Sequence, residues 1–150
     1  MTEKITREEL VTCPDCACFN IRKASRVVTQ VYEEIMHDTG LRGTQFTVLV
    51  MVAAFESITI SHLAENLVMD RTTLTRNLKP LKKQQLIVIV PGADRRTRVV
   101  QLTDNGHERL RAALPLWKKA QLKIAKFMGS ERLDNLIGEL RVLEKIADQT

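Results

Sequence analysis

The chain has few aromatic side chains and no long apolar run. Aromatic residues make up 4% of its 150 residues, too few for the rows of stacked rings with which proteins hold single-stranded nucleic acid. The longest apolar stretch, from Phe46 to Phe55, is interrupted by Thr47 and is far shorter than the roughly 20 residues that cross a bilayer. The first residues are mostly polar and do not resemble a secretory leader. The sequence therefore predicts a soluble, cytoplasmic protein with no membrane partner.

Cysteine is confined to one short segment, at Cys13, Cys16 and Cys18. An odd and clustered set argues against the disulfide framework of a small secreted protein. The chain also shows no Ser, His and Asp set, no paired carboxylates and no glycine-rich phosphate loop. The sequence therefore predicts a protein that is not an enzyme and needs no cofactor.

Positive charge is concentrated between Asp70 and Val100. This segment has eight basic residues and two acidic ones, a surplus of six, whereas the net charge of the whole chain is +5. The remaining residues are therefore close to neutral in sum. A local surplus of this size predicts a polyanionic partner, and nucleic acid is the natural one.

The chain is expected to fold as one unit, because 44% hydrophobic residues can bury one ordinary core. Apolar residues recur at helical spacing along most of the chain, and two runs rich in β-branched residues flank a Pro-Gly turn. The predicted helices span residues 17–38, 45–54, 61–67, 71–83, 104–127 and 131–147, and the predicted strands span 58–60, 86–90 and 98–102. The expected fold class is mainly α with a small β-hairpin wing.

Local signals mark the ends and weak points of these helices. Ser61, Asp70 and Thr103 each precede a helical pattern and are the predicted N-caps. Pro80 is expected to kink or tighten its helix, and Pro115 is expected to interrupt the long one.

The helices over 61–67 and 71–83 are joined by a short turn, as in a helix-turn-helix. Small polar and basic side chains on the outer face of the second helix can reach base edges and phosphates in a major groove. Arg71 and Arg76 are the best candidates for guanine or phosphate contacts. The other predicted DNA-binding residues of this helix are Thr72, Thr73, Thr75, Asn77 and Lys79. The alternative interpretation is an ordinary solvated helix face.

The predicted hairpin carries a second basic group at its turn. Arg95, Arg96 and Arg98 have no apolar neighbours that would order them, a placement suited to a minor groove or to phosphates. Asp94 is expected to brace one of these arginines through a salt bridge. Helix and hairpin together favour DNA binding over a surface charge cluster without a ligand.

The sequence resembles the MarR family of winged-helix transcription regulators. The resemblance is carried by the run from Met69 to Ile87, by the Asp-Arg-Arg of the hairpin and by the Leu-Thr-Asp-Asn-Gly that ends at Gly106. It implies a winged helix-turn-helix lobe over residues 44–102 and dimerisation helices over about 15–39 and 103–148, all within a single domain of residues 1–150. It also implies a homodimer that represses pseudo-palindromic operators of double-stranded DNA, with Arg96 in the minor groove, and release by a small aromatic ligand, a metal or an oxidant.

The cysteines allow three interpretations. A thiol near a helix N-terminus favours the thiolate, and a neighbouring thiol can resolve a sulfenic acid as a disulfide. Cys18 matches the peroxidatic position of the hydroperoxide-sensing branch of the MarR family, although Arg22 and Gly43 stand where that branch has tyrosines. Packing of Cys16 and Cys18 at the dimer interface ranks slightly ahead of sensing. A zinc site is the weakest of the three interpretations, because the histidines that could supply a further ligand are scattered along the sequence.

Two other functional classes remain open at this point. Cys13 and Cys16 have the two-residue spacing of a thiol oxidoreductase, but they lack the strand-then-helix context of a thioredoxin-like motif. A non-regulatory helical interaction module would share the shape and would show no preference among DNA sequences.

Overall fold

A computed structural model describes residues 4–94 and 96–149. The helices are α1 (Ala17–Met36), α2 (Gly43–Phe55), α3 (Ile60–Asn66), α4 (Arg71–Lys83), α5 (Asp104–Met128) and α6 (Ser130–Glu144). The strands are β1 (Ile58–Thr59), β2 (Ile87–Pro91) and β3 (Arg98–Leu102), and three short 3-10 turns are η1 (Cys13–Asp15), η2 (His37–Thr39) and η3 (Lys145–Gln149).

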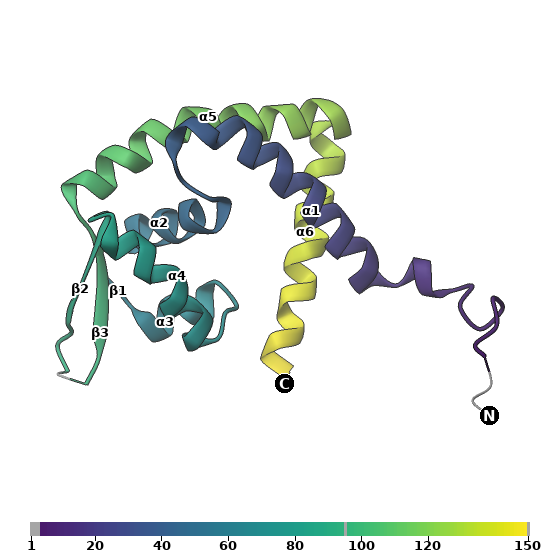
Figure 1. The fold of residues 1–150 in the computed structure, drawn as a ribbon, viewed down its shortest axis with the longest axis horizontal. Coiled ribbons are helices and arrows are strands. Elements are labelled where there is room, and N and C mark those ends of the chain that lie inside the picture. Colours follow the sequence, from purple (N-terminus) through teal and green to yellow (C-terminus); the bar gives the residue numbers. More distant parts are fainter. Residues whose placement is uncertain (1–3, 95, 150) are drawn as a thin grey trace.

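The long helix α5 spans the molecule and joins two parts (Figure 1). Helices α2, α3 and α4 form a lobe with the sheet under the first half of α5, and α6 descends separately from its far end. Helix α1 packs along α5. Among the helices that the structure describes, none combines the length and the apolar composition of a membrane span.

The sheet is antiparallel and has the strand order β1-β3-β2. Strands β2 and β3 form the predicted hairpin, in the register that pairs Ile87 with Leu102 and Pro91 with Arg98. The predicted short strand is also present, and its Ile58 pairs with Val100. Both residues of this pair are buried, so the hairpin is anchored to the core at its base.

The hydrophobic core lies in the lobe. Leu74, Leu78 and Leu81 on one side of α4 meet α2, whose Val48, Leu49 and Val52 are fully buried, and the core also includes Leu63, Leu86, Ile87, Val100 and Leu110. Helix α6 buries only one side chain, Leu133. The core therefore fixes the lobe and leaves α6 without support from it.

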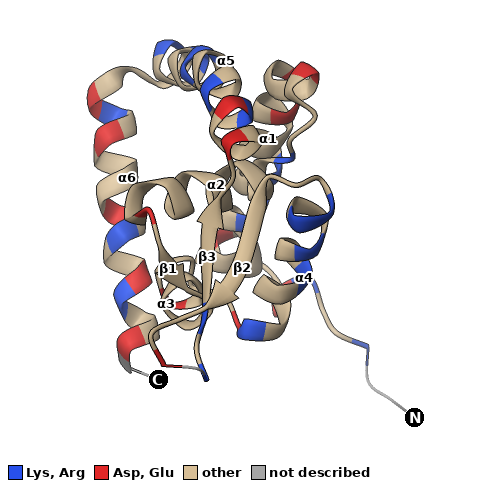
Figure 2. Ribbon diagram, turned by 90° about the vertical axis from the view of Figure 1, so that its left-hand side faces the viewer, with Lys and Arg blue, Asp and Glu red and all other residues tan. Residues whose placement is uncertain are grey.

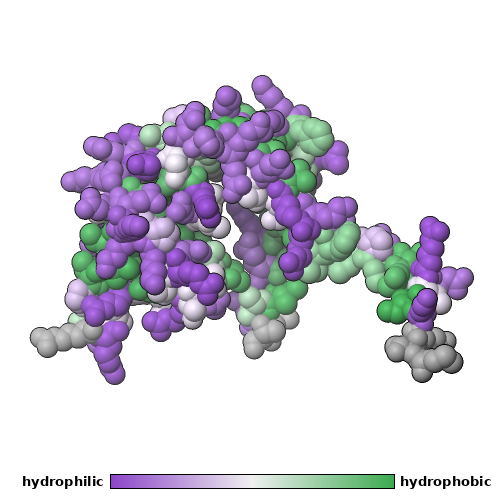
Figure 3. Space-filling model, viewed as in Figure 1, coloured by the Kyte–Doolittle hydropathy of each residue, from purple (hydrophilic) through white to green (hydrophobic). Residues whose placement is uncertain are grey.

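Helices α1 and α6 expose large apolar side chains, visible as green areas in Figure 3. We call this set the terminal apolar surface; it comprises Phe19, Ile21, Val27, Val28, Leu136, Leu140, Val142 and Leu143. Isolated apolar residues on a surface are ordinary, but two whole helices with such faces indicate a protein interface.

Two local predictions need correction. The N-cap of α3 is Thr59 and not Ser61: the Thr59 hydroxyl accepts the backbone N–H of His62 at 3.1 Å, and Ile60 already belongs to the helix. Pro115 does not interrupt α5, which is continuous. Because Pro115 is exposed, the carbonyl that loses its partner can be solvated. Pro80 lies inside α4, which continues to Lys83 as predicted.

The predictions for Asp70 and Thr103 are confirmed. The Asp70 side chain accepts the backbone N–H of Thr73, and the Thr103 hydroxyl accepts that of Gly106 at 3.0 Å. Both residues have the extended backbone that an N-cap requires.

Candidate nucleic-acid interface

Helix α4 is held in place at both its start and its inner side. Asp70 Oδ1 accepts the Thr73 backbone N–H at 2.8 Å, and Oδ2 accepts the Thr73 hydroxyl at 2.5 Å. These hydrogen bonds from Thr73 favour the carboxylate and lower the pKa of Asp70 from its ordinary value. The three buried leucines of α4 fix which face turns outward, so its orientation follows from packing.

The outward face of α4 gathers five polar and basic side chains along one shallow groove. We call it the recognition face; it comprises Arg71, Thr72, Thr75, Arg76 and Lys79. All five residues are exposed. The Thr75 hydroxyl donates to the Arg71 carbonyl at 2.7 Å, which leaves its lone pairs free to accept from a ligand. The face therefore offers cationic donors and hydroxyl groups on a rigid helix.

Two residues of the predicted set are not part of the recognition face. Thr73 and Asn77 are half-buried, and the Thr73 hydroxyl is already donated to Asp70. The Asn77 amide donates weakly to Met69 Sδ, at 3.7 Å. Asn77 instead lines a second groove, between α4 and the start of α2, with Arg42 and Gln45. Sequence reasoning missed this groove because it joins segments that are distant along the chain.

The hairpin turn is ordered by Asp94. Its Oδ1 accepts the Arg96 backbone N–H at 3.0 Å, and its Oδ2 lies 3.5 Å from an Arg96 guanidinium nitrogen. The Arg96 side chain is 91% exposed, so this ion pair contributes little stability and leaves Arg96 available. Arg98 is exposed at the start of β3, and Arg95 lies outside the described residues. Basic segments of α4 and of the hairpin appear in blue in Figure 2.

Cys13 begins η1, and Cys16 and Cys18 lie at the start of α1. All three cysteines are exposed and form no disulfide within the single chain. Cys16 is the residue before α1, and its backbone N–H donates to the Cys13 carbonyl at 3.1 Å. Cys18 lies in the first turn of α1. Burial of Cys16 and Cys18 at a dimer interface stays a prediction. No three His, Cys, Asp or Glu side chains are grouped to hold a metal ion in the part of the chain that the structure describes.

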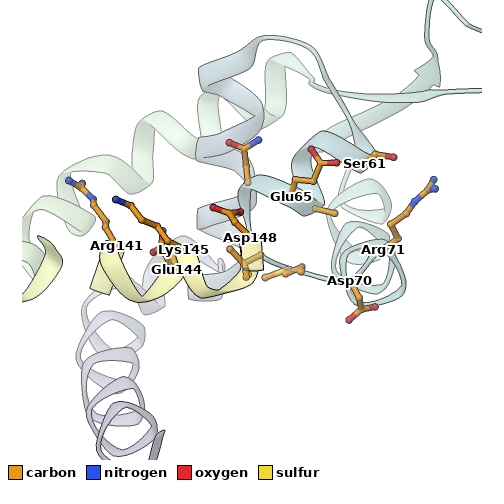
Figure 4. Close-up of a pocket in the computed structure, with 13 residues that line it drawn as sticks. Ser61, Glu65, Asp70, Arg71, Arg141, Glu144, Lys145 and Asp148 are labelled. Carbon is orange, nitrogen blue, oxygen red and sulfur yellow. The ribbon is translucent and has the colours of Figure 1, made fainter. Parts of the chain in front are cut away.

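A cleft separates the start of α4 from the end of the chain (Figure 4). Glu65, Asp70 and Arg71 line it on the side of the lobe, and Arg141 and Lys145 line it on the side of α6 and η3. Charges of both signs therefore line the space between the terminal helices and the lobe. The spacing of residues in the sequence contains no signal for such a cleft.

The MarR-family model matches residues 39–97. The transcriptional regulator MosR of M. tuberculosis, solved in complex with DNA, is 32% identical, with a TM-score of 0.81 over 89% of this chain and 97% of that chain. A mutant of E. coli MarR, solved in complex with operator DNA and 20% identical, has the same fold, with a TM-score of 0.78 over 94% of this chain and 99% of that chain.

A curated relative of this chain is the organic hydroperoxide resistance transcriptional regulator of Bacillus subtilis. It is 29% identical over 90 residues, which are 59% of this chain and 61% of that protein. The matched part thus spans about three fifths of that relative. Together with the fold, these similarities show that the chain belongs to the MarR family of winged-helix transcription regulators. The predicted family and fold class are confirmed.

Proposed function

We propose that this chain is a homodimeric regulator of transcription that binds double-stranded DNA and represses pseudo-palindromic operators. The observation that carries the proposal is the division of α4 into two faces. Leu74, Leu78 and Leu81 are buried, and the recognition face is exposed and contains three cations without an acid. A helix of this kind fits a major groove.

The second part of the proposed interface is the hairpin. Arg96 is exposed at a turn whose backbone is held by Asp94, so its guanidinium can enter a minor groove beside the one occupied by α4. Arg71 and Arg76 then contact guanine or phosphate, and Lys79 contacts phosphate. MosR, a relative with the same fold that was solved in complex with DNA, supports DNA as the ligand.

The proposed dimer forms through the terminal apolar surface. Helix α6 buries only Leu133 within its own chain, while Leu136, Leu140 and Leu143 are each more than one third exposed. Burying these side chains against the same helices of a second copy removes apolar area from water. The proposed dimerisation segments are residues 15–39 and 103–148, and residues 44–102 form the proposed DNA-binding lobe.

Selection of bound duplexes from a random pool tests the proposal. We expect a two-fold symmetric consensus with half-sites about one helical turn apart. On that duplex, Arg76→Ala is expected to weaken binding by about 1 to 3 kcal/mol. Arg132→Ala, which removes an exposed arginine from α6, is the matched control and should change nothing. Binding without any preferred sequence would contradict the proposal and favour the helical interaction module.

We also propose that oxidation of the cysteines weakens operator binding. Three exposed thiols lie in η1 and at the start of α1, a helix of the proposed dimer interface, and the B. subtilis relative is named for organic hydroperoxide resistance. Attack of a thiolate on a hydroperoxide gives a sulfenic acid and an alcohol, and a second thiol then forms a disulfide and releases water. A small aromatic ligand in the cleft of Figure 4 is the other proposed signal.

Mass spectrometry after mild hydroperoxide treatment, paired with operator binding, separates these signals. We expect the mass change of one disulfide and weaker binding in the native chain. The variant with Cys13, Cys16 and Cys18 replaced by serine should keep full affinity under the same treatment. Unchanged thiols and unchanged affinity would remove oxidative control. The similar proteins are regulators and not enzymes, and we propose the same non-catalytic, cytoplasmic role here.

A further inference from the structure

Helix α5 carries a second concentration of positive charge. Between Arg109 and Gly129 the chain has six basic residues and no acidic one. The net charge of the whole chain does not reveal this segment, because acidic residues elsewhere offset its positive charge. Figure 2 shows several of these basic positions in blue along α5.

Four of these cations lie along one groove on the outer side of α5. Lys118, Lys119, Lys123 and Lys126 line it, together with Pro115, Leu122 and, from α1, Ile35. We call these four lysines the α5 lysine row. All four are exposed, and none takes part in an ion pair among the residues that the structure describes. Their charges are therefore not neutralised within the chain.

The lysine row lies on the far side of the molecule from the recognition face. In Figure 1, α5 runs along the top of the lobe, whereas α3 and α4 lie at its lower side. Leu110, Ala113 and Ala120 of α5 are buried towards the rest of the chain, so the lysines on the other side of the helix point away from it. A straight duplex seated on α4 and the hairpin does not reach them.

The chemistry of the row favours a polyanion with many equivalent charges. Lysine is a compact, mobile point charge that suits phosphates, whereas specific carboxylate pairing favours the planar arginine. Lysine is also depleted at the centres of protein interfaces. Symmetric pairing of the row with its own copy would place like charges together, which is unfavourable. Leu122 is 59% exposed and is the only large apolar residue of the groove exposed to this extent.

We propose that the α5 lysine row binds the phosphate backbone of a second DNA duplex, so that one dimer bridges two duplex segments. The contact is independent of sequence, because lysine ammonium groups on phosphates carry no base information. This inference goes beyond the proposed function, although bridging also requires the recognition face to bind its own duplex.

Bridging is measured by capturing a labelled random duplex on beads that carry an operator duplex and the full-length protein. Replacing Lys118, Lys119, Lys123 and Lys126 by glutamine should abolish capture and leave the affinity for a single operator unchanged within about twofold. The matched control replaces Lys4, Arg7, Arg26 and Arg132, all exposed, by glutamine, with the same loss of charge, and should keep capture. Equal loss in both variants would show a general charge effect and overturn the proposal.

A second measurement keeps this inference separate from the proposed function. In a chain with Arg71, Arg76 and Lys79 replaced by glutamine, we expect weak residual binding of a random duplex. Four phosphate contacts predict a slope of log affinity against log salt of about −3 to −4, and the lysine substitutions should remove this binding. If this variant shows no residual binding, the inference about the lysine row is refuted, whereas the proposed function of the native recognition face is not affected. If the lysine substitutions dissociate the dimer, the α5 lysine row contacts a second copy of the chain and not DNA, and the inference is again refuted.

Discussion

Gly106 is the residue whose replacement most directly tests how the hairpin is attached to α5. A Cβ atom at this position would lie 2.0 Å from the carbonyl oxygen of Leu86 and 3.0 Å from its carbonyl carbon. The same oxygen accepts the Thr103 backbone N–H at 3.1 Å. The first turn of α5 therefore packs directly on the backbone that leads into β2, and only glycine allows this approach.

The expected cost of Gly106→Ala follows from these contacts. Backbone must move away from the new methyl group, and overpacking of this kind costs about 1 to 3 kcal/mol. Loss of the hydrogen bond between Thr103 and Leu86 costs about 1 kcal/mol more. We expect a decrease of about 2 to 4 kcal/mol in the free energy of unfolding, measured by urea denaturation of the dimer at a fixed protein concentration.

Gly138→Ala is the matched control for this substitution. Gly138 lies inside α6, and a Cβ atom there would meet nothing within 4 Å. Alanine is the better helix former, so this variant should gain about 0.5 to 1 kcal/mol. Operator affinity should fall in Gly106→Ala, because the base of the hairpin shifts. A Gly106→Ala protein as stable as the native one would refute the close-packing argument.

Three further predictions follow from individual residues. Val68 has a φ of 49° and is 61% exposed. Val68→Gly should raise the free energy of unfolding by about 0.5 to 1 kcal/mol, because glycine relieves the cost of this left-handed conformation; a loss of stability in urea would contradict this prediction. Hydrogen bonds from Thr73 lower the pKa of Asp70 in the folded chain, so the ionised carboxylate stabilises the fold above the unfolded pKa, and this stabilisation is lost as the pH falls through the folded pKa. Asp70→Asn should flatten this dependence of the free energy of unfolding on pH, and an unchanged pH profile would contradict the assignment. Arg96→Ala should weaken operator binding by about 1 to 3 kcal/mol if the guanidinium contacts a base edge, and fluorescence anisotropy showing native affinity would remove Arg96 from the interface.

The sequence by itself determined the order of the elements. Leucines at helical spacing on α4, Asp70 at its N-cap and β-branched residues on both sides of the Pro-Gly turn are local signals, and local signals survive in the folded chain. The charge surplus between Asp70 and Val100 is likewise a property of the sequence. These features were sufficient to predict the helix-turn-helix, the hairpin and the family.

Tertiary packing decided which side chains of that segment are available. Thr73 and Asn77 lie beside exposed residues in the sequence, but the burial of Leu74 and Leu78 turns them towards Asp70 and Met69. The requirement for glycine at position 106 comes from Leu86, which is distant along the chain. The cleft of Figure 4 and the groove at Ile35 also join separate elements. Periodicity describes only one element at a time, whereas these features arise where two elements meet.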